Sequence, residues 1–366
     1  MEENVIKRRE RLQQHEDVFI CIPQGYTHQI SPGLVLKLDG AMYGTKQASR
    51  EHRALEPLMT RLDRCRSTSD VCVFVKTAAL SLVVIAIYVN NGLIAAESDK
   101  IIAAELKALN DAYKLKVLDP VSNFLSMQFD HLADGIFLHH SKYVKSILDC
   151  FGFVLLSRSN ASTPMDERHG LDTSPPTSNV TLYQSPVVDD WQAVKRIFLY
   201  LANTVDFGIF YRRNSSVNIV AYSDASWAND LVTCRSVGGY AILVAGGVIL
   251  WRLRQQNLVA TSTTKSELLA ASETTKEVIS TCKLATDLEE PPSGPTIIFE
   301  DNQAAIAIAL NPASHGRTKH FGVAQLFVRD RVALGDVALK YISTHDMVAD
   351  SLTPGEECRS RLSRRH

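Results

Sequence analysis

The last third of the chain has the strongest structural pattern in the sequence, because its hydrophobic periodicity switches repeatedly between that of a strand and that of a helix. The order is three strands, a helix, a strand, two helices, a strand and a closing helix at or after Asp350, which predicts a mixed sheet with helices on its faces. A Gly246-Gly247 pair is the expected turn between the second and third strands. The expected strands are 217–225, 239–247, 248–254, 296–300 and 337–343, and the expected helices are 264–288, 303–310 and 318–332.

Four acidic residues of this segment stand where an expected strand ends or a helix begins. Such positions can converge at one edge of an α/β sheet. Carboxylates gathered there repel one another and stay ionised together only if cations neutralise them, and Mg²⁺ prefers such hard oxygen ligands. The alternative is a set of separate, solvated surface acids. The four are Asp224 at the end of the first strand, Glu267 in the first turn of the long helix, Asp301 after the fourth strand and Asp350 after the last strand.

The sequence around these acids decides between the two interpretations. The surrounding words are AYSDASWAND (221–230), KSELLAASETTKE (265–277), FEDNQAAIAIAL (299–310) and YISTHDMVADSLTP (341–354). In this order, they resemble the ribonuclease H segments of copia-type retrotransposon Pol polyproteins. The resemblance implies a domain that cleaves the RNA strand of RNA–DNA hybrids with two Mg²⁺ or Mn²⁺ ions. It also implies that the catalytic and metal-binding residues are Asp224, Glu267, Asp301 and Asp350.

Three further residues of this segment are candidates for binding nucleic acid. Arg317, Lys319 and His320 follow the FEDNQ word and are able to contact phosphates. For the lone histidine, a structural role is the alternative. Two departures from the family pattern, Lys265 beside the metal-binding glutamate and Pro354 in place of a lysine, indicate relaxed selection.

The middle of the chain carries a second set of words, EDVFICIPQGY (16–26), LDGAMYGTKQASREH (38–52) and IYVNNGLI (87–94). They resemble the palm of the reverse transcriptase in the same polyproteins. The resemblance implies that Lys46 and Gln47 lie near the incoming nucleotide and the template. A solvated surface lysine is the alternative for Lys46.

The polymerase site in this segment is degenerate. The family has Tyr-Val-Asp-Asp on a tight hairpin, where both acids hold catalytic Mg²⁺, whereas this chain has Asn90 and Asn91. An asparagine offers one neutral carbonyl oxygen in place of an anionic carboxylate, so the implied RNA-directed DNA polymerase is inactive. The family's remaining polymerase acid lies upstream of the EDVF word, in a segment that this sequence does not contain. Because Asn90-Asn91-Gly92 suits a hairpin turn, we expect the fold to persist there.

The predicted architecture is an α+β or α/β chain, in which a partial reverse-transcriptase palm is followed by a ribonuclease H-like mixed-sheet domain. A helix is expected at 191–203, within the connection between them. The predicted segments are a charged, frayed N-terminal helix at 1–16, the palm at 17–165, a linker and connecting helix at 166–216, the ribonuclease H-like domain at 217–355 and a basic tail at 356–366.

Composition limits the partners and the compartment. Lys and Arg number 39 and Asp and Glu 40, so local patches rather than bulk charge must bind any nucleic acid. Seven scattered cysteines fit reduced intracellular thiols. The apolar run 77–89 is too short to cross a bilayer and is expected to be a buried strand. We therefore expect an intracellular protein of the cytoplasm or nucleus that is not secreted, has no transmembrane segment and uses no small-molecule cofactor.

Three hypotheses follow for function. The chain is a polymerase-dead remnant with a working ribonuclease H site, a module that binds RNA–DNA hybrids or other nucleic acid without cutting, or a decayed element with no function. The binding hypothesis relies on basic residues such as Lys46, Arg317 and Lys319.

Overall fold

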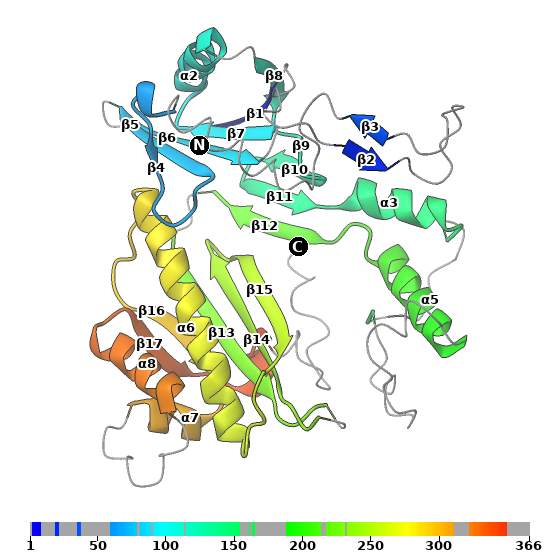
Figure 1. Cartoon of the computed structure of the whole chain (residues 1–366), viewed down its shortest axis with the longest axis vertical. Helices are drawn as coiled ribbons and strands as arrows, with labels where there is room; N and C mark the ends of the chain where they lie inside the picture. Colours follow the sequence, from blue (N-terminus) through cyan, green and yellow to red (C-terminus); the bar gives the residue numbers. More distant parts are fainter. Residues whose placement is uncertain are drawn as a thin grey trace. The chain divides into compact units, whose positions relative to one another are not determined.

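The computed structural model forms two compact units, one of Met1–Phe124 with Thr286–Glu289 and one of Leu125–Ala285 with Glu290–His366 (Figure 1). No helix among the described residues is long and apolar enough to cross a membrane. The residues that the structure describes are 2–8, 19–21, 35–37, 59–78, 81–88, 91–112, 115–153, 161, 163–164, 188–213, 217–230, 233–310 and 322–349.

The first unit is built on an antiparallel six-stranded sheet in the order β4-β5-β6-β7-β1-β8, with the helix α2 packed on its apolar core. Ile102, Leu106 and Leu109 of α2 are buried together with Val83, Ile85 and Ile94 of the central strands. The elements are β1 (Glu2–Arg8), β4 (Cys65–Arg66), β5 (Val73–Ala78), β6 (Ser81–Tyr88), β7 (Asn91–Ala96), α2 (Asp99–Ala112) and β8 (Leu115–Pro120), with the short strands β2 (Phe19–Cys21), β3 (Val35–Lys37) and β9 (Asn123–Phe124).

Two local expectations for this unit are wrong. The charged N-terminus is the strand β1 where it is described, and not a helix, because it pairs with both β7 and β8. Pairing of this kind is non-local, so it leaves no signal in the segment's own periodicity. The apolar run 77–89 is also not a single strand, since it covers the end of β5 and the whole of β6.

The hairpin of β6 and β7 is the element in which we expected a degenerate polymerase site. Tyr88 pairs with Asn91, and Gly92 already lies within β7, opposite Ile87. The hairpin is therefore confirmed, but Asn91 and Gly92 are strand residues rather than turn residues. Asn90 lies outside the described residues.

The second unit contains a five-stranded sheet in the order β15-β14-β13-β16-β17, in which the first three strands are antiparallel and the last two run parallel to β13 (Figure 1). Buried residues of β13, β14, β16 and β17 form one apolar core cluster with residues of α6, α7 and α8. A smaller antiparallel sheet joins β10, β11 and β12. The elements are β10 (Met127–Leu132), β11 (Gly135–His139), α3 (Ser141–Cys150), α5 (Val188–Asn203), β12 (Gly208–Arg212), β13 (Ile219–Ser226), β14 (Val237–Val244), β15 (Gly247–Gln255), α6 (Thr263–Asp287), β16 (Thr296–Glu300), α7 (Gln303–Leu310), α8 (Gly322–Ala333), β17 (Val337–Tyr341) and the 3₁₀ turn η2 (Thr344–Asp346).

The predicted mixed sheet, its order of elements up to the last strand and the connecting helix are confirmed, while the closing helix expected at or after Asp350 lies outside the described residues. The glycine pair acts differently from our expectation. The β14–β15 turn is Ala245-Gly246, both with positive φ, as a tight hairpin turn of this kind requires. Gly247 is the first residue of β15, and a Cβ there would lie 2.5 Å from the ring of Tyr211. The second glycine is therefore needed for close approach, and the Tyr211 hydroxyl donates to the Val248 carbonyl at 2.7 Å.

A buried ion cluster holds α2 against the sheet of the first unit. The Arg64 guanidinium and Glu105, which are 3% and 8% exposed, form an ion pair. Lys76 Nζ lies 2.9 Å from the other Glu105 oxygen. Glu105 thus joins α2, β5 and the segment before β4.

Glu105→Ala should lower the free energy of unfolding of this unit by about 3–5 kcal/mol, because it leaves the Arg64 charge buried and unpaired. Hydrogen exchange of the α2 and β6 amides in the full chain measures this loss. Glu97→Ala, at an exposed position, is the control and should change stability by less than about 0.5 kcal/mol. Equal effects of the two variants would show that the cluster does not stabilise the unit.

Candidate metal centre

Three of the four acids singled out from the sequence lie together in the second unit. Asp224, Glu267 and Asp301 each offer a carboxylate oxygen, and these oxygens all lie within 4.8 Å of one another. Parallel pairing of β13 with β16 brings Asp224 and Asp301 to the same edge of the sheet. Asp350 lies outside the described residues, so its place at this site stays a prediction.

The local sequence around each acid explains how it is held. The Ser262 hydroxyl accepts a hydrogen bond from the Lys265 amide and caps the start of α6. Because α6 begins at Thr263, Glu267 is its fifth residue and lies one turn from the start of the helix. Asn302 Oδ1 accepts from the Ala305 amide at 3.0 Å and caps α7 directly after Asp301. Asp301 therefore lies between the end of β16 and the start of α7, whereas Asp224 lies two residues before the end of β13.

A fourth carboxylate, missed in the sequence, lies beneath this group. Glu300 is the last residue of β16 and is 1% exposed. The sequence did indicate that Glu300 is buried, because strand alternation places it on the same buried face as Ile298. One oxygen of Glu267 and one of Glu300 are buried without a hydrogen-bond partner among the described residues.

Burial and mutual repulsion oppose ionisation of this cluster. Burial raises the pKa of Glu267 to about 11, with further contributions from the charges of Glu300, Asp224 and Asp301. Burial and the Asp301 charge likewise raise the pKa of Glu300 well above its ordinary value. The orphaned oxygens and the concentrated negative charge fit a divalent cation, for which Asp224, Glu267 and Asp301 supply anionic oxygen ligands.

A neighbouring hydroxyl positions the most accessible of these acids. Thr344 Oγ1, in the 3₁₀ turn after β17, donates to Asp301 Oδ2 at 2.7 Å. This bond leaves the other Asp301 oxygen available to a cation. The 3₁₀ turn η2, which follows β17 and precedes Asp350 in the sequence, therefore contacts the site.

The remaining residues predicted from the sequence lie elsewhere. Asn91 begins β7 in the first unit and is half-buried. The other predicted site residues are outside the described part of the chain and stay predictions: Lys46, Gln47, Asn90, Arg317, Lys319 and His320.

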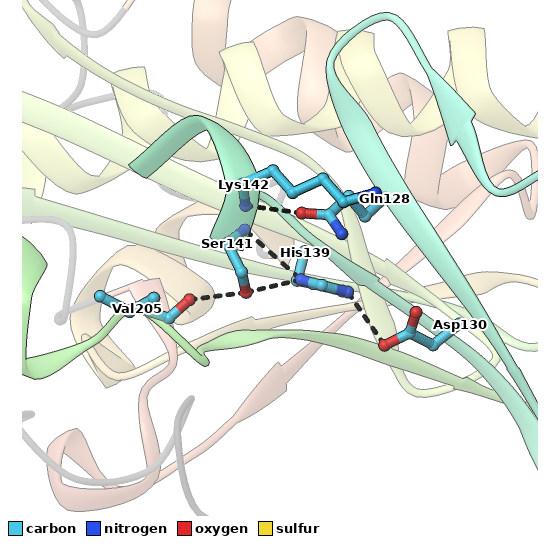
Figure 2. Close-up of polar contacts among 6 residues, drawn as sticks. All are labelled: Gln128, Asp130, His139, Ser141, Lys142 and Val205. Atoms are coloured by element: carbon cyan, nitrogen blue, oxygen red, sulfur yellow. Dashed lines mark hydrogen bonds and ion pairs between the residues drawn. The ribbon is translucent and has the colours of Figure 1, made fainter. Parts of the chain in front are cut away.

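A second polar cluster lies in the sheet of β10–β12 (Figure 2). Its serine, histidine and aspartate are linked in the order of the nucleophile, base and acid of a Ser-His-Asp catalytic triad. Ser141 Oγ lies 2.6 Å from His139 Nδ1, and His139 Nε2 lies 3.0 Å from Asp130 Oδ2. Ser141 is only 7% exposed, and its hydroxyl donates to the Val205 carbonyl at 2.8 Å. The Ser141 backbone amide also donates to His139 Nδ1 at 3.4 Å, and the tautomer of the imidazole decides which group donates in its contacts with the Ser141 hydroxyl and with Asp130.

This second cluster is a structural clamp rather than a catalytic site. Figure 2 shows Gln128 of β10 beside the start of α3, where its Oε1 accepts from the Lys142 amide at 2.6 Å. The helix has no capping side chain of its own at His140, so the neighbouring strand provides the acceptor. The cluster joins β10 and β11 to α3 and to the loop before β12.

Comparison with known proteins shows what this chain is similar to. Residues 11–167 match the family described as Reverse transcriptase (RNA-dependent DNA polymerase). The Retrovirus-related Pol polyprotein from transposon RE2 of Arabidopsis thaliana is 28% identical over 369 residues, which cover 92% of this chain and 25% of that polyprotein. The corresponding polyprotein from transposon TNT 1-94 of Nicotiana tabacum is 27% identical over 378 residues, covering 92% and 28%. The chain thus spans about a quarter of the length of these relatives, and the resemblance predicted from its sequence words is confirmed.

Among solved structures, the N-terminal RNase H domain of a Mycobacterium tuberculosis protein, solved as a fusion with maltose-binding protein, has a TM-score of 0.28 at 10% identity. It covers 37% of this chain and 91% of that one. The fold assignment rests on the strand order of the chain itself.

In EDTA, the second unit should lose stability as pH rises from about 5 to 9. The folded pKa of Glu267 is about 11, above the ordinary value of 4.5, so between these values the folded state keeps a proton that the unfolded state has lost. The slope should reach at most about 1.4 kcal/mol per pH unit for one such proton. Urea unfolding followed by tryptophan fluorescence measures it, because Trp191, Trp227 and Trp251 all lie in this unit.

Added Mg²⁺ should restore the stability at high pH, since the cation replaces the proton. Glu267→Gln should remove most of the pH slope and the response to Mg²⁺. Glu273→Gln, on an exposed position of the same helix, is the matched control and should retain both. Stability independent of pH in EDTA would contradict the repulsion that we ascribe to this site.

Proposed function

The chain is a relative of the copia-type retrotransposon Pol polyproteins, and on that premise we propose that its carboxylate centre cleaves the RNA strand of RNA–DNA hybrids. The observation that supports this most directly is the convergence of three carboxylate oxygens within 4.8 Å. Buried acids this close are costly to ionise, so a structural role alone does not account for them.

The residues have distinct tasks in this proposal. Asp224, Glu267 and Asp301 hold two divalent cations, and Asp350 completes the set. Bound cations supply an activated water and stabilise the leaving oxygen of the phosphodiester. Thr344 keeps Asp301 oriented through its 2.7 Å hydrogen bond. In this proposal the substrate phosphates contact three residues, Arg317, Lys319 and His320. Because the net charge of the chain is −1, phosphate binding requires such a local positive patch.

The polymerase function of the relatives is lost in this proposal. At the β6–β7 hairpin, Asn90 and Asn91 replace the two acids of the family pattern. Neutral amides do not offset the charge of two cations, although Lys46 and Gln47 still suit contact with nucleic acid. The remaining candidate functions, binding without cleavage and no function, are outcomes of the experiments below.

Asp301→Asn should reduce Mg²⁺-dependent cleavage of an RNA–DNA hybrid by about a hundredfold or more, because it removes an anionic ligand while keeping the shape of the side chain. The measurement is the rate of cleavage of a labelled hybrid by the full chain. Asp336→Asn is the control and should cleave like the unaltered protein. Asp336 pairs with Arg331 and directly precedes the amino end of β17, whereas Asp301 follows the carboxyl end of β16. Equal rates for both variants would overturn the assignment, and binding without any cleavage would favour the non-catalytic alternative.

Primer extension on an RNA template should give no product at any Mg²⁺ concentration, because the hairpin lacks carboxylates. Elongation of a labelled primer measures this directly. An active reverse transcriptase assayed in the same buffer is the positive control. Any template-dependent incorporation by the purified chain would contradict the loss of the polymerase site.

A further inference from the structure

The strand β15 forms one edge of the five-stranded sheet, and most of its outer side is unpaired. It pairs with β14 along its whole length, and no other strand among the described residues pairs with it. Tyr211 of β12 covers only its beginning, through the hydrogen bond to the Val248 carbonyl. An open edge of this kind presents backbone donors and acceptors to any other extended chain.

The register shows which backbone groups lie on the open side. The Gln256 amide donates to the Ser236 carbonyl at 2.8 Å, so the backbone groups of Gln256 point towards β14. This direction alternates along a strand, and those of Arg254 therefore also point towards β14. The backbone groups of Trp251 and Leu253 point the other way, so they are positioned to hydrogen-bond with an added strand.

One face of this edge is apolar and exposed. Trp251 and Leu253 are 57% and 46% exposed. Alternation places both on the face of the sheet opposite α6, because Arg252 between them lines a pocket against that helix. Tryptophan is enriched at protein interfaces and often contributes much of their affinity. These two side chains therefore fit the apolar side chains of an added strand.

The other face of the edge carries positive charge. Arg252 and Arg254 line a pocket of about 250 Å³ between β14, β15 and the first half of α6. The lining carboxylate, Glu273, is neutralised by Lys276 Nζ at 2.6 Å. Arg254 is exposed and forms no ion pair with another described residue. This face therefore favours acidic side chains on the same added strand.

Charge argues against a second copy of this chain as the occupant. In an antiparallel pair of two β15 strands, the arginines of both copies would share one face, and like charges opposite each other destabilise a sheet. A phosphate backbone would suit the arginines, but it would use neither the unpaired backbone nor the apolar face. The three features together fit an extended peptide.

We propose that the edge of β15 is a docking site for another protein, which adds an extended segment of alternating acidic and apolar residues. The segment pairs antiparallel with β15. Its apolar side chains lie beside Trp251 and Leu253, and its acidic side chains pair with Arg252 and Arg254. This surface does not include the carboxylate centre, so the inference goes beyond the proposed nuclease function.

The probe is a fluorescein-labelled synthetic peptide of alternating glutamate and valine, about eight residues long, as an ordinary strand is. Fluorescence anisotropy with the full chain measures its Kd. We expect saturable binding, and a peptide with lysine in place of glutamate should bind at least roughly tenfold more weakly. Arg254→Gln should raise the Kd of the glutamate peptide roughly tenfold, whereas Arg331→Gln, in α8, is the matched control and should leave it unchanged.

N-methylated peptides test the strand pairing without altering the protein. In the antiparallel pair, the valines lie opposite Trp251 and Leu253 and direct their amides towards β15, while the glutamate amides point away. Methylation of the valine amides should raise the Kd at least roughly tenfold, because hydrogen bonds are lost, and methylation of the glutamate amides should leave it nearly unchanged. Leu253→Pro, which removes an outward amide, should weaken the unmodified peptide in the same way.

Urea unfolding establishes that Leu253→Pro folds, and the methylated peptides provide the test if it does not. Equal binding of the two methylated peptides would overturn strand addition, and no saturable binding up to about 1 mM peptide would overturn the docking site. An Arg254→Gln variant that loses affinity for an RNA–DNA hybrid but not for the peptide would assign the arginines to nucleic acid instead. All measurements are made in EDTA, so their outcome does not depend on whether the chain cleaves hybrids.

Discussion

Electrostatic repulsion among buried carboxylates is the constraint on which the second unit depends. Glu267 and Glu300 are held below the surface, beside Asp224 and Asp301, where water cannot screen their charges. Apolar packing directly beneath opposes the repulsion. Ile242, Leu268 and Ile298 are almost completely buried between the sheet and α6, and each contributes about 1.5–3 kcal/mol on burial. The apolar core therefore fixes the acids in place, and a cation stabilises the arrangement further by mass action.

The β6–β7 hairpin of the first unit shows the opposite case, in which the fold does not depend on the acids of its family. Its register is set by Ile85, Ile87 and Ile94, which alternate into the core on both strands. Tyr88 and Asn91 close the ladder through backbone pairing, which an asparagine provides as well as an aspartate. An uncharged side chain at Asn91 is thus compatible with the pairing of the two strands.

Sequence reasoning succeeded where a structure is set by nearby residues and failed where distant segments decide it. The boundaries of β16 and α7 follow from local periodicity and from the Asn302 cap, and they were predicted to the residue. The strand β1 was missed because its place between β7 and β8 is determined by partners about 90 and 110 residues away. Three acids of the candidate site were found through their positions near element ends together with the family resemblance of the surrounding sequence, whereas Glu300 is an inward-facing strand residue. Strand alternation marks this position as buried, but it does not by itself assign a functional carboxylate to it, because such positions are normally apolar.

The metal centre and the pocket lined by β14 and β15 share the helix α6, while β14 is paired with the strand β13 that carries Asp224. β14 pairs with the strand that carries Asp224, and its two glycines, Gly238 and Gly239, leave room between the ladder and α6. The same helix supplies Glu267 to one side and Ala270 to the other. β14 separates β13, which carries Asp224, from β15, which carries Arg252 and Arg254, so the guanidinium groups of β15 start two strands away from this carboxylate.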